Sequence, residues 1–282
     1  MSLQPLSQST LEPLVRIALA EDLGEIGDIT TNAIVPADQI WEAALVTRKA
    51  GVVAGLELAR LAFVLCDASL QFEIKKADGT VVMAGDVLAV VKGPARALLT
   101  GERTALNFLC HLSGIASATH ALVQAAKPHK ARICDTRKTT PGLRVLEKYA
   151  VRAGGGSNHR FGLYDAVLIK DNHIAVAGSI TKAVEQARAA VGKNIRVELE
   201  VDTLVQLQEA LSLPLDAVLL DNMDIPTLTA AVTMVGGRFE TEASGHVTTQ
   251  NVNAIAVTGV DVISSGWLTH SAPILDVGLD RL

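Results

Sequence analysis

The chain has 282 residues, a length that accommodates one large domain or two modest ones. Its 25 basic and 30 acidic residues give a formal net charge of −5, which argues against nucleic-acid binding driven by bulk positive charge. Apolar residues make up 49 % of the chain and aromatic residues 3 %, a composition typical of a helix-rich soluble enzyme rather than a disordered chain. We find no uninterrupted apolar run of about 20 residues. The chain starts without a secretory signal, and its three cysteines form no CxxC pair, so we expect a cytoplasmic protein.

The first hundred residues predict a small α/β unit. Apolar spacing predicts a helix from about Leu11 to Gly24 and another from Leu56 to Leu65. Short strands are expected at 43–47, 70–74 and 87–91, and Asp78-Gly79 is a plausible turn. A helical period then continues from Thr100 to about Lys127. It is interrupted near Ser113-Gly114, where we expect the boundary between two domains.

After that boundary the sequence becomes a repeat. Each unit holds a short run of branched apolar residues that ends in polar or charged ones, and helical patterns separate most of the units. The six segments are 131–138, 165–173, 195–202, 216–223, 238–245 and 260–266. Strand, helix and strand at this spacing predict right-handed βαβ units and a parallel sheet. So many units in about 150 residues favour a closed barrel, and an open doubly wound sheet is the alternative.

Residues that alternate along these strands place charge on one face. The sets that share a face are Glu198, Glu200 and Asp202; Glu240, Glu242 and Ser244; and Leu168, Lys170 and Asn172. Because an unpaired charge in a dry core opposes folding by several kcal/mol, these groups must pair or line a wet mouth. In parallel barrels the mouth at the carboxyl ends of the strands carries catalysis.

The segment 134–173 is the densest in chemistry. It places five basic residues at or beside two strand ends, namely Arg137, Lys138, His159, Arg160 and Lys170. Such a cluster suits a polyanionic small molecule, and a solvated basic rim is the alternative. Glu200 and Asp221 each end a strand and either hold Mg²⁺ through water or neutralise the lysines.

A resemblance then becomes specific. The stretch DTRKTTPGLRVLEKYAVRAGGGSNHR, followed by LIKDNH, resembles the signature of the quinolinate phosphoribosyltransferase family, also called nicotinate-nucleotide pyrophosphorylase (carboxylating). GERTALNFLCHLSGIA, VELEVD, LLDNMD, EASG and ISSGWLTHS are also similar to family stretches, in family order over nearly the whole chain. The resemblance implies an α/β fold with two domains. These are an N-terminal sandwich-like α/β domain, residues 1–113 with the segment 270–282 returning to it, and a parallel, incomplete α/β barrel, residues 114–269.

The resemblance also implies an activity, that of a pentosyltransferase of de novo NAD biosynthesis. The family joins quinolinate to phosphoribosyl pyrophosphate with Mg²⁺ and gives nicotinate mononucleotide, pyrophosphate and carbon dioxide. Quinolinate carries two carboxylates, which match Arg137, His159, Arg160 and Lys170. The family arginine that matches Arg103 reaches the site from the neighbouring subunit, so we expect at least a homodimer.

Further roles follow from the same resemblance. Lys138 matches a central lysine near the pyridine and the leaving groups, and Glu200 and Asp221 match acids near the ribose and the metal. The remaining substrate-binding residues are Thr136, Ser244, Gly245, His246, Ser265 and Gly266, of which the two Ser-Gly pairs match phosphate-binding loops. His246 stands where many relatives carry glycine, and its side chain offers a hydrogen-bond donor in place of a closer backbone approach.

Three other functions remain open from the residues. One is a related phosphoribosyltransferase with another acidic heteroaromatic acceptor, such as the homologue linked to molybdate transport loci. Another is an aldolase-type barrel in which Lys138 or Lys170 forms a Schiff base. The last is a non-catalytic anion-binding protein, against which the paired acids beside the cations argue. None of these hypotheses involves nucleic acid or a membrane.

Overall fold

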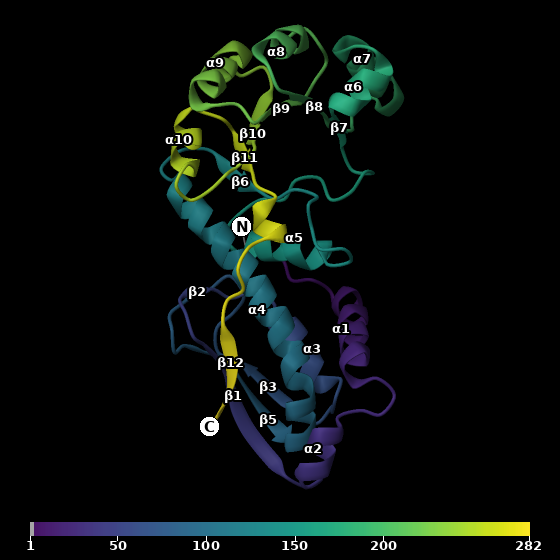
Figure 1. The fold of residues 1–282 in the computed structure, drawn as a ribbon, viewed down its shortest axis with the longest axis vertical. Helices are drawn as coiled ribbons and strands as arrows, with labels where there is room; N and C mark the ends of the chain where they lie inside the picture. The colour runs from purple at the N-terminus through teal and green to yellow at the C-terminus, as the bar shows by residue number, and fades with distance from the viewer. Residues whose placement is uncertain (1–2) are drawn as a thin grey trace. The chain divides into compact units, whose positions relative to one another are not determined.

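The computed structural model describes residues 3–282 and divides into two compact units, each considered by itself (Figure 1). The first unit contains the chain up to Ala118 together with residues 145–155 and 272–282. The second contains residues 119–144 and 156–271. The segment 145–155 holds nearly all of helix α5 (Arg144–Ala153), which the division by sequence placed with the barrel.

The first unit is built on an antiparallel sheet. In the described residues its strand order is β12-β1-β5-β3, and a separate two-stranded sheet pairs β2 with β4. The strands are β1 (Ile40–Thr47), β2 (Gly51–Val52), β3 (Gln71–Ile74), β4 (Val81–Val82), β5 (Val87–Pro94) and β12 (Val277–Arg281). The strands expected at 43–47, 70–74 and 87–91 are therefore present. The C-terminal strand β12 lies at the edge of this sheet beside β1.

Three helices precede or follow these strands: α1 (Gln8–Leu23), α2 (Ile29–Ile34) and α3 (Leu56–Val64). Helix α1 buries Leu11, Val15 and Leu19, the apolar stripe that predicted it. Helix α3 begins after Gly55, whose φ is +104°. The Asp78 carboxylate accepts hydrogen bonds from the N–H groups of Gly55 and Leu56 at 3.0 and 3.2 Å, which satisfies two donors at the helix start.

Helix α4 (Ala95–Ala126) runs without interruption through Ser113 and Gly114, so the break expected there is wrong. Ser113 uses its hydroxyl to accept a hydrogen bond from the N–H of Ala54 at 2.9 Å. A Cβ on Gly114 would overlap the carbonyl oxygen of Pro273 and lie 2.8 Å from the Cα of Ile274. The polar and small residues therefore mark close contacts with other segments of the first unit, not the end of the helix.

Helix α4 is also long and apolar enough to cross a membrane, judged by length and composition alone. It is the one helix within residues 3–282 that meets this test, which the sequence analysis did not anticipate. More than half of its most apolar window, 56 %, is buried inside the protein. A mostly buried core helix has this composition because it packs against other apolar side chains.

The second unit carries all six predicted parallel strands. They are β6 (Arg132–Cys134), β7 (Val167–Ile169), β8 (Val197–Val201), β9 (Ala217–Asp221), β10 (Glu240–Ser244) and β11 (Val262–Ser264). Their order across the sheet is β6-β11-β10-β9-β8-β7. This is the order of a barrel from which one pairing, β6 with β7, is missing in the described part of the chain. The closed barrel that the repeat favoured is therefore wrong, and the sheet is the incomplete barrel that the resemblance implied.

The free edge of β6 is occupied by another segment. Cys134 forms a parallel bridge with Ser157, and Ser157 donates its N–H to the carbonyl of Ile133 at 2.8 Å. Ser157 belongs to the connection between β6 and β7, which includes α5. Because this connection pairs with the edge where β7 would lie, β6 and β7 remain apart.

In chain order, at least one helix follows each strand from β7 to β11 (Figure 1). They are α6 (Asp171–Ala177), α7 (Ile180–Val191), α8 (Leu204–Ala210), α9 (Ile225–Val235), α10 (Val252–Val257) and α11 (Trp267–His270). Ser179, Thr203 and Asp224 each cap a helix by accepting the N–H of the residue three positions on. Val197, Leu199 and Val201 share one buried face of β8. The residues between them, Glu198 and Glu200, therefore face the interior of the barrel.

Candidate functional site

Charged side chains on the interior face of the sheet are paired, as the alternation predicted. Glu200 at the end of β8 forms an ion pair with Lys170, which directly follows β7. At the opposite end of the strands, Glu240 forms ion pairs with Arg132 and Arg196. Asp202 is an exception, because it lies beyond β8 and is exposed to solvent.

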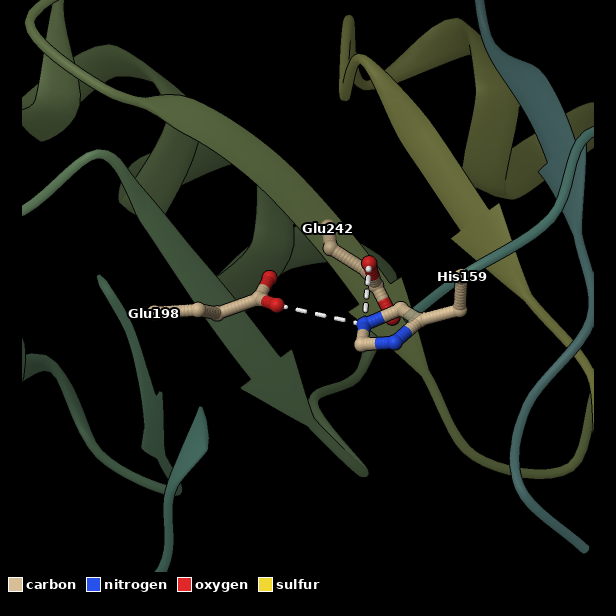
Figure 2. Close-up of side chains that lie close together, drawn as sticks. All are labelled: His159, Glu198 and Glu242. Carbon is tan, nitrogen blue, oxygen red and sulfur yellow. Dashed lines mark hydrogen bonds and ion pairs between the residues drawn. The ribbon is translucent and has the colours of Figure 1, made fainter. Parts of the chain in front are cut away.

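Between these pairs lies a buried cluster of His159, Glu198 and Glu242 (Figure 2). The Nε2 atom of His159 is 3.1 Å from Glu198 Oε2 and 3.5 Å from Glu242 Oε2. The two carboxylate side chains are only 4 % and 3 % exposed. Burial, together with the nearby Glu198 charge, raises the pKa of Glu242 to about 7.

The backbone of His159 is held in place by Asp135, just beyond β6. Its carboxylate accepts the N–H of His159 at 2.9 Å and a side-chain N–H of Asn158 at 2.6 Å. Asp135 is fully buried, so these hydrogen bonds are shielded from water. The segment after α5 therefore presents the imidazole to the interior of the barrel.

Two arginines flank this cluster with unused hydrogen-bonding capacity. The Nε atoms of Arg137 and Arg160 are buried and, within residues 3–282, have no hydrogen-bond partner. Arg160 donates from Nη1 to the carbonyl of Ala166 at 2.9 Å. Burial and the nearby Arg137 charge lower the pKa of the Arg160 guanidinium. Two neighbouring guanidinium groups with unsatisfied donors form a site suited to an anion.

A cavity of about 790 Å³ lies at the carboxyl ends of the strands. It brings together eight of the residues predicted from sequence: Thr136, Lys138, Asp221, Ser244, Gly245, His246, Ser265 and Gly266. The other predicted residues of the second unit, Arg137, His159, Arg160, Lys170 and Glu200, are not among those that line it. Arg103 lies on α4 in the first unit.

Lys138 is fixed by hydrogen bonds to its backbone. The Thr136 hydroxyl accepts the Lys138 N–H at 3.0 Å, and the Thr269 hydroxyl donates to the Lys138 carbonyl at 2.7 Å. A Cβ on Gly266 would lie 2.8 Å from the Lys138 Cδ, so glycine leaves room for the lysine side chain. The main chain is thus rigid where the amine reaches the cavity.

Two loops meet at the rim of this cavity. Gly245 has φ +106°, and a Cβ there would overlap Oδ1 of Asn222 and lie 2.9 Å from its Cγ. Asn222 (φ 53°) and His246 (φ 49°) are both left-handed. Since glycine adopts that conformation more readily than other residues, the backbone at Asn222 and His246 is strained.

Some cavity residues were not predicted as site residues. Asn222, Trp267 and His270 line it, and Asn222 donates a side-chain N–H to the Asp221 carboxylate at 2.7 Å. The signal for Asn222 was available, because it directly follows a predicted site residue at a strand end. Glu198 and Glu242 were placed on the interior face without a role, since the sequence does not show that two strands aim at one imidazole.

Models of a known family match both parts of the chain. The model described as quinolinate phosphoribosyl transferase, N-terminal domain, matches residues 28–113, and that for the C-terminal domain matches residues 115–280. The chain belongs to the quinolinate phosphoribosyltransferase family. It is similar to a protein of Bacillus subtilis (strain 168) named probable nicotinate-nucleotide pyrophosphorylase [carboxylating], with 45 % identity over 96 % of this chain and 93 % of the relative.

Other members of the quinolinate phosphoribosyltransferase family extend this likeness. Quinolinate phosphoribosyltransferase [decarboxylating] 1b of Nicotiana tabacum is 43 % identical over 95 % of this chain and 81 % of its own length. The crystal structure of NadC from Streptococcus pyogenes is 43 % identical, covers 99 % of both chains and superposes with a TM-score of 0.94. The fold of the family therefore extends over both units of this chain.

Proposed function

We propose that this chain is a carboxylating nicotinate-nucleotide pyrophosphorylase. It transfers the phosphoribosyl group of phosphoribosyl pyrophosphate to quinolinate and yields nicotinate mononucleotide, pyrophosphate and carbon dioxide. The observation that carries the proposal is a pair of neighbouring arginines, Arg137 and Arg160, whose buried Nε donors have no hydrogen-bond partner in the described residues of a member of this family. Buried donors of fixed charge without partners favour a ligand that is itself anionic.

The residues divide between the two substrates. Arg137, His159, Arg160 and Lys170 bind the two carboxylates of quinolinate. The cavity at the strand ends takes phosphoribosyl pyrophosphate, whose phosphates meet backbone N–H groups of the loops at 244–246 and 265–266 and the hydroxyl of Thr136. Lys138 lies in the same cavity, with its charge available to the leaving pyrophosphate.

The reaction begins with transfer of the ribose. The pyridine nitrogen bonds to C1 of the ribose as the bond from C1 to pyrophosphate oxygen breaks, and the carboxylates of Glu200 and Asp221 stabilise the positive charge that develops on the sugar. The ring nitrogen is then cationic. When the adjacent carboxylate leaves as carbon dioxide, the electron pair of the broken C–C bond stays on the ring carbon, which takes up a proton. Positioning and charge account for these steps without a covalent intermediate on the protein.

Glu200 and Asp221 also fit Mg²⁺. Carboxylate oxygens are the hard donors that this ion prefers, and the two residues end the neighbouring strands β8 and β9. Mg²⁺, when bound, neutralises charge on the pyrophosphate. The proposal further includes a cytoplasmic enzyme, at least a homodimer, in which Arg103 contributes to the site of the neighbouring subunit.

The test is a ¹H NMR time course with quinolinate, phosphoribosyl pyrophosphate and Mg²⁺, with nicotinate in a parallel tube. Nicotinate mononucleotide formed from quinolinate alone supports the proposal, and the Lys138→Ala variant serves as the matched inactive control. Lack of product from either acid refutes quinolinate as acceptor and favours another acidic heteroaromatic. A borohydride-trapped adduct on Lys138 or Lys170 would instead support the Schiff-base alternative.

A further inference from the structure

The cluster of His159, Glu198 and Glu242 contains two acids that the proposed reaction does not use. The ligand atoms of the three residues lie within 4.8 Å of one another. Glu198 comes from β8 and Glu242 from β10, which are separated in the sheet by β9, and both carboxylates approach the same ring atom, Nε2 (Figure 2). The arrangement therefore places two carboxyl groups on one side of one imidazole.

This geometry favours a proton on Nε2 of the His159 ring. A carboxylate only accepts hydrogen bonds, so a short contact from Nε2 to Glu198 is favourable when Nε2 carries a proton. A neutral ring with its proton on Nδ1 would instead turn the Nε2 lone pair toward two carboxylates. Two carboxylates beside one imidazole also favour its second proton, because a nearby negative charge stabilises the cation.

The cluster is costly to bury, which argues against a purely structural role. Glu198 is 3 % exposed, and its Oε1 atom has no hydrogen-bond partner in the described part of the chain. Figure 2 shows the Glu198 carboxylate directed into the cluster. An apolar group would fill this interior at lower cost, since a buried charge with an unsatisfied oxygen opposes folding.

The charged groups around the cluster do not remove the cost of burying these two acids. Arg196, before β8, interacts with both acids but hydrogen-bonds to Glu240. Arg160 interacts electrostatically with Glu198. Asp135 accepts a hydrogen bond from the backbone of His159. The residue of β9 that pairs with Glu242 is the apolar Leu219. Burial raises the pKa of Glu242 to about 7, so this carboxyl group holds its proton more tightly than an exposed glutamate does.

We propose that Glu198 and Glu242 are positioning residues that hold the His159 ring as an imidazolium with Nε2 turned into the barrel. The positive charge of the ring then attracts an anionic group of the substrate. This inference rests on the proposed function only in taking that anion to be a carboxylate of the acceptor. Glu198 supplies the direct hydrogen bond to Nε2, and Glu242 helps to set the pH at which the imidazolium loses its charge.

The test without substrate is ¹⁵N NMR of histidine-labelled protein titrated with acid and base. His159→Asn identifies the ring signals. In the wild type we expect a proton on Nε2, and in Glu198→Gln the second proton is lost at a pH lower by about one unit or more. Glu242→Gln should move the midpoint in the same direction. The matched control is Glu240→Gln, which removes the same charge from the same strand but contacts Arg132 and Arg196, and it should move the midpoint less.

Three NMR outcomes would overturn the proposal. The first is an Nδ1-protonated neutral ring near pH 7. The second is an equal shift in all three glutamine variants, because the effect would then come from net charge alone. The third is loss of the ring proton on adding one equivalent of Zn²⁺ or Mg²⁺, which would make the cluster a metal site. None of these measurements depends on turnover.

The test with substrates is the pH dependence of kcat/KM for quinolinate. In Glu198→Gln the fall at high pH should begin at lower pH, and KM for quinolinate should rise while KM for phosphoribosyl pyrophosphate stays the same. Glu198→Asp, which keeps the charge, should restore part of the profile. A wild type that makes no nicotinate mononucleotide refutes the proposed function alone. A wild-type turnover with unshifted midpoints in Glu198→Gln refutes this inference alone.

Discussion

Gly245→Ala tests the geometry of the phosphate-binding loop. The residue has φ +106°, where an L-amino acid is strained by about 1–2 kcal/mol. The new Cβ would also overlap Oδ1 of Asn222 and approach its Cγ at 2.9 Å, so the Asn222 side chain must move. That movement breaks its hydrogen bond to Asp221, a loss of about 1 kcal/mol. We therefore expect the free energy of unfolding to fall by about 2–4 kcal/mol.

Because Asp221 lines the same cavity, KM for phosphoribosyl pyrophosphate should rise by about tenfold or more in Gly245→Ala. Stability is measured by urea denaturation, and KM by initial rates. Gly178→Ala is the matched control, since Gly178 has φ +94° and a Cβ added there would meet nothing within 4 Å. It should lose about 1–2 kcal/mol and keep the wild-type KM.

A double-mutant cycle separates backbone strain from the clash. Asn222→Gly removes the atoms that Gly245→Ala would strike and tolerates the φ of 53° at that position. In this background Gly245→Ala should cost about 1–2 kcal/mol less than in the wild type. An equal cost in both backgrounds, or an unchanged KM in the single variant, would refute the argument that the loops are fitted to each other.

Further predictions concern the site, the pH dependence and the packing. Lys138→Ala and Arg160→Ala should each lower kcat/KM by roughly 10²–10³-fold in the NMR assay, and near-wild-type rates would contradict the site assignment. Mixing inactive Arg103→Ala and Lys138→Ala subunits should restore roughly a quarter of the activity by random exchange into dimers, whereas no recovery would argue against a shared site. Because the pKa of Glu242 is raised to about 7 in the folded state, the fold binds that proton more tightly than the unfolded chain. Stability from this group is therefore fully present below about pH 4.5 and is lost as the pH rises from there through 7, by on the order of 3 kcal/mol, and Glu242→Gln should flatten this change in denaturation curves. Gly114→Ala should destabilise the protein by about 1–3 kcal/mol in urea, and a neutral effect would contradict the close approach of the C-terminal segment to α4.

The strands of the second unit could be predicted because each one carries its own local signal. A branched apolar run in 216–223, for example, is followed by a capped helix, and such a pattern needs no knowledge of distant contacts. The opening of the barrel could not be predicted this way. It depends on Ser157, in the connection between β6 and β7, which pairs with the edge of β6, and a local pattern does not show such a contact.

The incorrect break at Ser113-Gly114 has a related cause. Polar and small residues inside an apolar helical pattern are ordinarily read as a boundary. Here the Ser113 hydroxyl meets the backbone of Ala54, and Gly114 admits the backbone at 273–274. Such contacts join segments far apart in the chain. The local sequence pattern therefore indicates where α4 makes close contacts, but not which segments it contacts.

The candidate site likewise has one part that could be predicted from the sequence and one part that could not. Lys138, Asp221 and the loop at 244–246 follow strand ends, and parallel strands bring their carboxyl ends to one edge, so their meeting in one cavity follows from topology. The meeting of Glu198 with Glu242 does not, because it depends on the register across β9 and on the connection that supplies His159. The roles of all these residues in the reaction stay predictions.

The charged side chains of the second unit differ in how they are paired, which bears on anion binding. Glu240 neutralises Arg132 and Arg196 at the amino ends of the strands, whereas the Nε donors of Arg137, after β6, and Arg160, before β7, have no hydrogen-bond partner in the described residues. The acids beside His159, Glu198 and Glu242, are buried and face the imidazole. Because the acids are paired with arginines or with the imidazole, the interior carries several carboxylates without repelling a dicarboxylate acceptor.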